Sequence, residues 1–376
     1  MTISHSQFNQ EIFDKARATR TPLVGAFELT RSCNLACRMC YVRKYPAAGK
    51  PLSEQLSAGQ WLEIGRQAAK AGMLYLLLTG GEIFLRPDFF EIYEGLYKLG
   101  LQISLNTNAT LITPAIAERL AQHPPRTVAV TIYGASPATY ADVSGDATGF
   151  ERVLRGIRLL DENKLNVRLR TTVIRQNLAD FEKIYQLSQE LGHGLRLVDY
   201  VFAEDEEGED PYAVRLSPVE QRECASRLYG WIVARQNEEL KAGTEEQAST
   251  EEEDNDPTDI EQQREEPWKE AKHAFLCPAG NYSFSVNAAG KLLACLLMDE
   301  PGLGMGADVS LGEAWKQLKD LCEAVPVCRE CAECEIRAHC SVCPAKLKTE
   351  TGAFAKKAPY LCQMAEVNFA ASKGER

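Results

Sequence analysis

Three cysteines lie close together near the start of the chain, at Cys33, Cys37 and Cys40. Cysteine thiolates are the usual ligands of iron–sulfur clusters, and a four-iron cubane normally takes four of them. Three thiols on one short segment would therefore leave one iron open to a different ligand. A zinc site or a chance grouping of cysteines is the alternative interpretation.

Nine further cysteines lie near the other end of the chain. Two fully ligated cubanes need eight thiolates, so this region has enough thiols for two clusters. Pairs of thiols with two residues between them are also typical of zinc ribbons, which is the alternative here. The nine are Cys277, Cys295, Cys322, Cys328, Cys331, Cys334, Cys340, Cys343 and Cys362.

The rest of the composition indicates a reducing compartment for these thiols. The chain has 376 residues, of which 45% are hydrophobic, and this excludes a wholly disordered protein. No apolar run approaches the ~20 residues that a bilayer crossing needs, and the N-terminal residues lack the hydrophobic block of a secretion signal. We therefore predict a cytoplasmic protein without membrane contact. Thirteen cysteines then indicate metal or redox chemistry rather than disulfides.

The net charge of −11 is concentrated in one segment. Residues 245–266 hold eleven acidic residues and one arginine, and so carry −10 of it. We predict a solvated insertion there, or alternatively a docking site for a basic peptide or protein. The remaining chain is near neutral and has no cluster of lysines and arginines, which argues against a nucleic-acid partner.

Hydrophobic periodicity predicts strands that alternate with helices between residues 23 and 202, as in a parallel sheet covered by helices. A helix over 218–240 follows, in which the isolated Cys224 is expected to be a small buried hydrophobic residue. The other predicted helices are 58–71, 150–162 and 178–191. The predicted strands are 24–29, 73–78, 102–106, 127–132, 166–173 and 195–201.

Chemistry on such a sheet lies at the carboxyl ends of the strands. The three-cysteine segment follows the first predicted strand, and Gly80-Gly81-Glu82 follows the second. Glycines there allow a ligand to approach the backbone closely. Asn106-Thr107-Asn108 and Thr131-Ile132-Tyr133 end the next two strands. These segments are expected to meet at one edge.

The cysteine spacing, together with Gly80-Gly81-Glu82 one strand later, resembles the radical S-adenosylmethionine (SAM) superfamily. The resemblance implies a partial (β/α)6 TIM-like barrel. It also implies a [4Fe–4S] cluster on Cys33, Cys37 and Cys40 whose open iron is chelated by the amino and carboxylate groups of SAM. An electron from the cluster then splits SAM into methionine and a 5'-deoxyadenosyl radical, which removes a hydrogen atom from the substrate.

The same resemblance implies contacts to SAM. Some relatives carry an arginine where this chain has Ser144, and Arg170 is a candidate to replace it. The residues expected to bind SAM are Met39, Tyr41, Gly80, Gly81, Glu82, Thr131, Ser144 and Arg170. Asp199 and Tyr133 are candidate catalytic groups, each with a purely structural role as the alternative.

The C-terminal cysteines, with Gly290 five residues before Cys295, resemble the SPASM domain, which binds auxiliary iron–sulfur clusters. The ligands implied for an outer cluster are Cys331, Cys334, Cys340 and Cys362. Those implied for an inner cluster are Cys277, Cys295 and Cys343. Its fourth ligand is open: Cys328 is preferred, Cys322 comes second, and an open iron is the third choice.

SPASM proteins of this kind modify peptides, so the resemblance implies a maturase of a ribosomally synthesised peptide, with crosslink or thioether formation favoured. The implied partners are a precursor peptide and an electron donor such as flavodoxin or ferredoxin. Because few residues precede the first strand, we also expect either a separate leader-recognition protein or direct binding of the peptide by the barrel mouth and the acidic bridge. The alternatives are a radical SAM enzyme acting on a small molecule or a sulfatase-like protein, and a non-catalytic iron–sulfur or zinc protein. The expected division is an N-terminal segment 1–22, a barrel 23–202, a bridge 203–270 and a SPASM domain 271–376.

Overall fold

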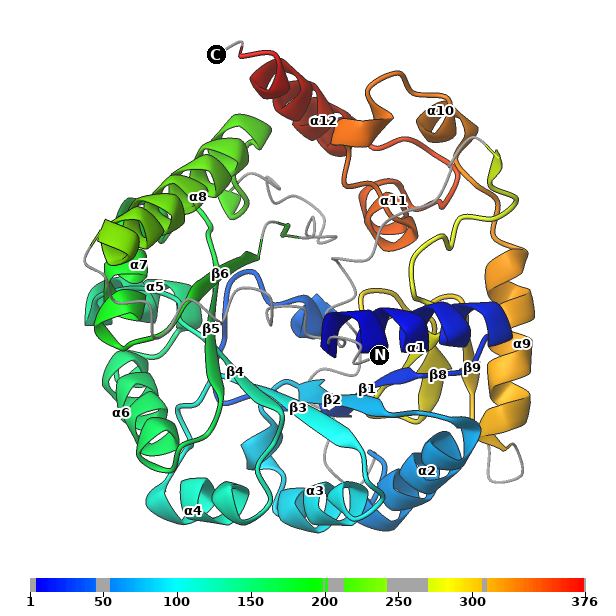
Figure 1. Cartoon of the computed structure of the whole chain (residues 1–376), viewed down its shortest axis with the longest axis horizontal. Coiled ribbons are helices and arrows are strands. Elements are labelled where there is room, and N and C mark those ends of the chain that lie inside the picture. The colour runs from blue at the N-terminus through cyan, green and yellow to red at the C-terminus, as the bar shows by residue number, and fades with distance from the viewer. Residues whose placement is uncertain are drawn as a thin grey trace.

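The computed structural model describes residues 5–44, 55–198, 200–201, 213–241, 270–305 and 310–374. Within these residues one nine-stranded sheet runs in the order β6-β5-β4-β3-β2-β1-β7-β8-β9 (Figure 1). The strands are β1 Val24–Thr30, β2 Tyr75–Gly80, β3 Gln102–Thr107, β4 Thr127–Thr131, β5 Val167–Thr172, β6 Leu195–Val198, β7 Ser283–Val286, β8 Lys291–Leu293 and β9 Gly302–Gly304.

Helices alternate with the first six strands, and α2, α3, α4 and α6 lie on the outer side of the arc of strands (Figure 1). This α/β arrangement with a parallel core confirms the predicted fold class, and the six predicted strands match β1 to β6 with small differences at their ends. The helices are α1 His5–Thr19, α2 Ala58–Ala71, α3 Phe89–Tyr97, α4 Pro114–Gln122, α5 Pro137–Ser144, α6 Gly149–Glu162, α7 Phe181–Glu190, α8 Pro218–Lys241, α9 Leu311–Glu323, α10 Arg329–Ala332, α11 Pro344–Thr351 and α12 Pro359–Ser372.

The strand β1 is buried along its whole length because both of its faces are covered. On the outer face, Phe27 stacks on Trp61 of α2 with 5.1 Å between the ring centroids. The helix α2 begins at a capping box of Ser57 and Gln60 and ends at Gly72, whose left-handed backbone suits glycine. The strand that leads to the three cysteines is thus fixed from outside the sheet.

The C-terminal region continues the same sheet. The strand β7 pairs in parallel with β1, from Val24 opposite Ser283 to Phe27 opposite Val286, and β8 and β9 follow in antiparallel pairing. The helix α9 joins α2, because the Gln67 side chain accepts a 2.7 Å hydrogen bond from the Leu311 amide. The division of the chain at residue 271 stays a prediction, since the sheet itself runs across it.

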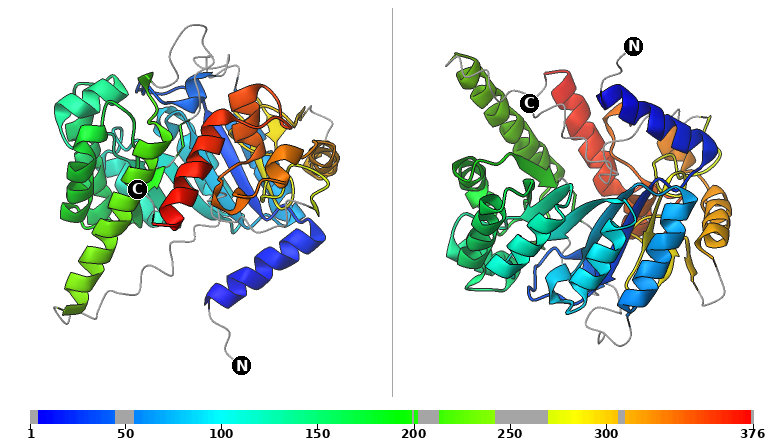
Figure 2. Two further views of the ribbon diagram at one scale, coloured as in Figure 1. Left: turned by 90° about the horizontal axis from the view of Figure 1, so that it is seen from above. Right: turned by 60° about the horizontal axis from the view of Figure 1, so that its bottom comes forward.

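The helix α8 packs against the barrel, with Cys224 and Leu228 buried beside Phe181. Cys224 is 1% exposed in this apolar cluster, as expected of a small hydrophobic residue. Figure 2 shows α8 and α12 side by side, and the Tyr360 hydroxyl at the start of α12 donates to the Leu216 carbonyl. Among the described residues, no helix has the length and apolar character to cross a bilayer. The acidic segment 245–266 lies outside the described residues.

Candidate functional site

The segment 31–40, here called the thiol loop, leaves the carboxyl end of β1 and is held by main-chain hydrogen bonds on two sides. After β2, the Gly81 amide donates to the Thr30 carbonyl at 2.7 Å and the Glu82 amide to the Ser32 carbonyl at 2.9 Å. At the end of α5, the Ala36 amide donates to the Ser144 carbonyl at 2.8 Å. The backbone of the thiol loop is therefore positioned by the neighbouring β2 and α5 segments.

Glycine is required where the β2 turn meets the thiol loop. A Cβ atom at Gly81 would lie 2.2 Å from the Ser32 carbonyl oxygen, and one at Gly80 would lie 2.2 Å from the Thr30 oxygen. Gly80 also has a φ of +141°, which residues with a side chain rarely adopt. The Gly-Gly pair thus brings two strand ends into direct contact, and its main chain lies beside the thiols.

The carboxylate of Glu82 is fully buried and binds three donors. It accepts hydrogen bonds from the Asn108 amide and the Thr107 hydroxyl, both at 2.8 Å, and from the Phe84 amide at 3.2 Å. Burial raises its pKa to about 7 against the lowering effect of these bonds. This side chain ties the ends of β2 and β3 together and so fixes the turn that follows Gly80 and Gly81.

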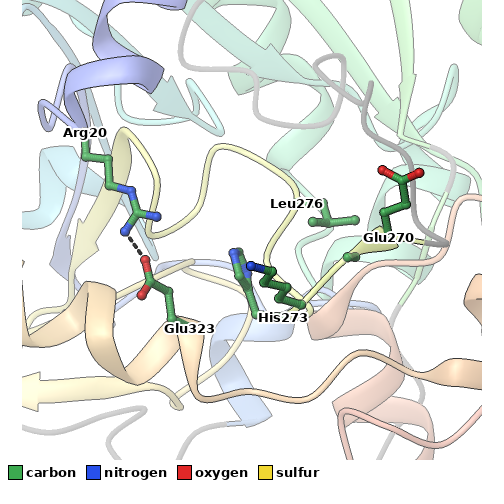
Figure 3. A pocket seen from close by; sticks show the side chains of 7 residues that line it. Arg20, Glu270, His273, Leu276 and Glu323 are labelled. Atoms are coloured by element: carbon green, nitrogen blue, oxygen red, sulfur yellow. Dashed lines mark hydrogen bonds and ion pairs between the residues drawn. The ribbon is translucent and has the colours of Figure 1, made fainter.

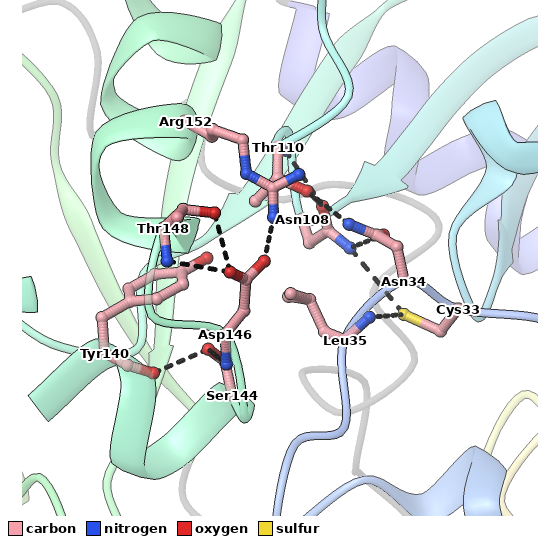
Figure 4. A network of polar contacts seen from close by, with 10 residues as sticks. All are labelled: Cys33, Asn34, Leu35, Asn108, Thr110, Tyr140, Ser144, Asp146, Thr148 and Arg152. Carbon is pink, nitrogen blue, oxygen red and sulfur yellow. Dashed lines mark hydrogen bonds and ion pairs between the residues drawn. The ribbon is translucent and has the colours of Figure 1, made fainter.

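Asn108 extends this connection to the thiols, as Figure 4 shows. Its amide nitrogen donates to the Asn34 side chain at 3.0 Å and lies 3.8 Å from the Cys33 sulfur. Thr110 supports both asparagines through hydrogen bonds of 2.7 and 2.8 Å. The sequence singled out Asn106-Thr107-Asn108 without assigning a role, and Asn108 is a contact of the thiol loop.

The three thiols form one group that suits an iron–sulfur cluster by its donor type. Burial raises the pKa of Cys33 to about 11 and that of Cys37 to about 12, and in both cases the neighbouring thiols add to the shift. The Tyr133 phenol hydrogen-bonds to the Cys37 thiol, and burial raises its pKa well above the ordinary value. Tyr133 therefore lies beside the thiol loop. Among the described residues, no three Cys, His, Asp or Glu side chains are arranged to hold a single metal ion.

A buried acid lies next to the thiol loop on the inner face of the sheet. Glu28 points away from the α2 side and is 4% exposed, and its carboxylate accepts a 3.0 Å hydrogen bond from Arg31. Arg31 also lies 3.9 Å from Asp299 of the C-terminal region. Burial raises the pKa of Glu28 to about 7, which outweighs the lowering by Arg31. Sequence reasoning missed Glu28, although a lone charge inside an apolar strand was the available signal.

Arginines occupy the same inner face on the far side of the barrel. Leu169 of β5 belongs to the outer core, so the alternating Arg168 and Arg170 face inward. Register pairs Thr131 with Arg170 and Arg170 with Arg196 of β6. The expected SAM contacts Thr131 and Arg170 are therefore neighbours. Arg168, Arg170 and Arg196 are together called the arginine wall. Arg168 and Arg196 were not predicted as site residues.

The remaining predicted residues take up different positions. Met39 and Tyr133 both pack against the small buried cluster that contains Val143. Tyr41 begins a short 3-10 turn, Tyr41–Lys44. The Ser144 side chain is fully buried and its hydroxyl donates to the Tyr140 carbonyl at 2.7 Å, so only its main chain supports the loop. Asp199 lies outside the described residues.

The C-terminal thiols lie in two separate groups. Cys328 hydrogen-bonds with Cys331, and the charges of Cys340 and Cys362 also act on Cys331. Cys322 instead lies against Gly280 and interacts with Cys277. Cys343 caps α11, with its sulfur accepting from the Lys346 amide at 3.4 Å. Cys328, the preferred fourth ligand of the inner cluster, is therefore a neighbour of the thiols assigned to the outer one.

A separate hollow lies between the end of α1, residues 270–276 and the end of α9, as Figure 3 shows. It is lined by Arg20, Glu270, His273, Leu276 and Glu323, and Arg20 pairs with Glu323 across it. None of the predicted site residues lines it. The thiol loop and the inner face of the sheet are the better candidate site.

Residues 27–188 match the family model of the radical SAM superfamily. The chain therefore contains a radical SAM domain. It is an enzyme of the radical SAM/SPASM type, and this domain implies SAM and a [4Fe–4S] cluster as cofactors.

Relatives of the chain carry more than one function. An AdoMet-dependent heme synthase of Methanosarcina barkeri is 28% identical over 360 residues, which cover 91% of this chain and 97% of that protein. A PqqA peptide cyclase of Rhizobium meliloti is 30% identical over 167 residues, which cover 44% of this chain and 42% of that protein. The solved structure of anSMEcpe with bound AdoMet and Cp18Cys peptide has a TM-score of 0.65 at 17% identity, and covers 94% of this chain and 98% of that one. The last comparison shows a shared fold.

Proposed function

We propose that this enzyme cleaves SAM at a cluster on Cys33, Cys37 and Cys40 and uses the resulting radical to modify a ribosomally synthesised peptide. The observation that carries the proposal is that the thiol loop, the Gly80-Gly81 turn and Thr131 lie at the carboxyl ends of the parallel strands β1, β2 and β4. The carboxyl edge of the sheet is where barrels of this kind place their chemistry.

When bound there, the cluster would supply the single electron that splits SAM. The chain's own part is to hold and tune it: the three thiols ligate it, and Tyr133 and Asn108 direct hydrogen-bond donors at Cys37 and Cys33. Donors to cluster sulfurs stabilise the more negative reduced form and so raise the reduction potential. The close contact between Gly81 and Ser32 holds the thiol loop against the turn after β2.

The proposed SAM contacts follow from the same edge. Gly80 and Gly81 offer main-chain groups to the methionine amino end, and Met39 and Tyr41 lie in and just after the thiol loop. Thr131 and Arg170 are register neighbours on β4 and β5, which suits a hydroxyl and a carboxylate of one ligand. The fully buried side chains of Glu82 and Ser144 would act by holding these segments in place.

The inner face favours a substrate that carries carboxylates. The arginine wall supplies guanidinium groups, which bind carboxylates in a bidentate manner. Glu28, with its pKa near 7, is a candidate to accept or return a proton at neutral pH. Acidic peptides fit this lining, and peptide substrates are supported by the similarity to the PqqA peptide cyclase and by the shared fold with the peptide complex of anSMEcpe.

The test is to reconstitute the enzyme without oxygen and to add SAM, a reductant and the peptides encoded beside its gene. We expect 5'-deoxyadenosine together with a mass change in one peptide. Loss of two hydrogens would indicate a crosslink, and an unchanged mass with hydrogen exchange from solvent would indicate epimerisation. Cleavage of SAM with every such peptide unaltered would rule out the peptide proposal.

A second candidate substrate is an iron tetrapyrrole. It is favoured by the alignment with a heme synthase, which covers 91% of this chain. Tetrapyrroles with propionate groups would also suit the arginine wall. The same assay decides between the two when a carboxylate-bearing iron porphyrin replaces the peptide and its mass is followed.

Further parts of the proposal concern partners and place. Two auxiliary iron–sulfur clusters in region 271–376 would carry an electron away from the substrate radical. An electron donor such as flavodoxin or ferredoxin and a separate leader-recognition protein would act with the enzyme. The cysteine-rich composition supports a cytoplasmic location, where thiols stay reduced.

A further inference from the structure

The C-terminal thiols belong to two different apolar cores. Cys328, Cys331 and Cys340 pack in a small core that contains Tyr200 and Leu361. The charges of Cys334 and Cys340 act on Cys362, which links the remaining thiols to the same place. The outer thiol group is therefore Cys328, Cys331, Cys334, Cys340 and Cys362. Its five thiols exceed the four that one cubane requires.

Cys322 lies in the other core, on the sheet side. This core also contains Cys277, Cys295 and Cys343. Cys322 is 2% exposed in the last turn of α9, and a Cβ atom at Gly280 would lie 2.5 Å from its sulfur. Gly280 follows Cys277 by three residues, and Cys277 contributes to the electrostatic environment of the Cys322 thiol. The two thiols thus face the same small space.

Hydrogen bonds to the backbone fix the approach of Cys322 to Cys277. Three residues before Cys277, the Ala274 amide donates to the carbonyl of Val325, three residues after Cys322, at 3.0 Å. On the other side of Cys277, the Asn281 side chain donates to the Cys277 carbonyl at 2.7 Å. The segments that carry the two thiols are joined by hydrogen bonds and do not depend on a metal to meet.

We propose that Cys322 is the fourth ligand of the inner auxiliary [4Fe–4S] cluster, together with Cys277, Cys295 and Cys343. Cys328 then belongs to the outer thiol group. This replaces the preference for Cys328 that sequence spacing suggested, because Cys328 hydrogen-bonds with Cys331 in the other core. Both clusters would be fully ligated by cysteine, which suits electron transfer rather than substrate binding at an open iron.

The test counts clusters without using activity. In a Cys33→Ala, Cys37→Ala, Cys40→Ala chain, anaerobic reconstitution should give about eight irons for two cubanes. Adding Cys322→Ala should lower the iron and acid-labile sulfide, or convert one cluster to the three-iron form seen by electron paramagnetic resonance. Adding Cys328→Ala should leave the inner cluster's spectrum unchanged. The matched control is Cys224→Ala, a buried cysteine of the α8 core, which should keep about eight irons.

Retention of all iron and an unchanged spectrum in the Cys322→Ala chain would overturn the proposal. Loss of the inner cluster's spectrum in the Cys328→Ala chain would do the same. If Cys322→Ala does not fold, Cys322→Ser preserves the size of the side chain and can ligate through oxygen. A spectrum altered only in the inner cluster then supports the assignment, and an unaltered one rejects it.

Discussion

The thiol loop and the C-terminal thiols present the same chemical groups on very different supports. The thiol loop is held by main-chain hydrogen bonds to the ends of β2 and α5, where glycine permits direct contact. The outer thiol group is held by side chains in a small core, next to a buried ion pair between Arg215 and Glu350. The first support leaves no room for an added Cβ at Gly80 or Gly81. The second depends on a few buried side chains.

Removing one cysteine from the thiol loop and one from the outer thiol group should give the largest difference between the two regions. Cys37→Ala is expected to reduce 5'-deoxyadenosine formation to the level without enzyme, because two thiols cannot hold the cluster. Cys334→Ala should keep part of the SAM cleavage and lose product formation. Chromatography of both products measures this. An equal loss in both variants would mean that the C-terminal region is needed for folding of the barrel.

Breaking the buried ion pair tests the second support. Arg215→Met should lower the free energy of unfolding by about 4 kcal/mol, because it leaves the Glu350 carboxylate buried without its partner. Urea denaturation measures the change, and the exposed pair of Arg227 with Glu182 provides the control. Arg227→Met is expected to cost about 1 kcal/mol or less. Equal costs would show that the C-terminal core does not depend on the buried pair.

The pH dependence of stability tests the inner face beside the thiol loop. The pKa of Glu28 is raised from 4.5 to about 7, so the folded protein keeps a proton that the unfolded chain loses in this window. Stability should therefore be greatest below the lower value and fall as pH rises to the upper one, by at most about 3 kcal/mol. Glu82 adds a slope of the same sign.

Glu28→Gln should remove roughly half of the fall in stability with pH that Glu28 and Glu82 cause together. Urea unfolding of the metal-free protein at about pH 5 and about pH 8 provides the comparison. An unchanged slope would show that Glu28 is ionised in the folded protein and that its pairing with Arg31 outweighs burial.

The glycine contact should give the smallest effect on stability and a selective effect on the barrel cluster. Gly81→Ala forces a Cβ atom against the Ser32 carbonyl and should cost about 2 kcal/mol, with loss of iron from the thiol loop. Gly230→Ala in α8 meets open space and should stabilise by up to about 1 kcal/mol. Iron analysis and thermal melting compare the two. Full iron in Gly81→Ala would show that the loop can shift without loss of its ligands.

Sequence reasoning succeeded where the signal was local. The alternation of apolar and amphipathic segments located β1 to β6, and the capping residues located α2 within its observed bounds. The three-cysteine spacing and Gly80-Gly81 lie within one strand-to-loop junction each, so their chemistry could be predicted from adjacent residues.

The rest depended on contacts between distant parts of the chain. Nothing in the spacing of Cys322 and Cys328 indicates which core each enters, because that is decided by the packing of α9 against the turn after Cys277. Glu28 gains its raised pKa from burial and from a neighbouring region that includes Asp299. Ser144 matched a family position by count, yet its side chain is enclosed by its own helix turn.

The parallel pairing of β7 with β1 has a practical consequence for anyone who shortens this protein. A barrel fragment cut near residue 270 would lose β7, the strand beside β1. The exposed edge of β1, which leads into the thiol loop, would then have unpaired amides and carbonyls. Such a fragment should self-associate through the bare edge. Useful truncations must therefore retain the hairpin formed by β7 and β8.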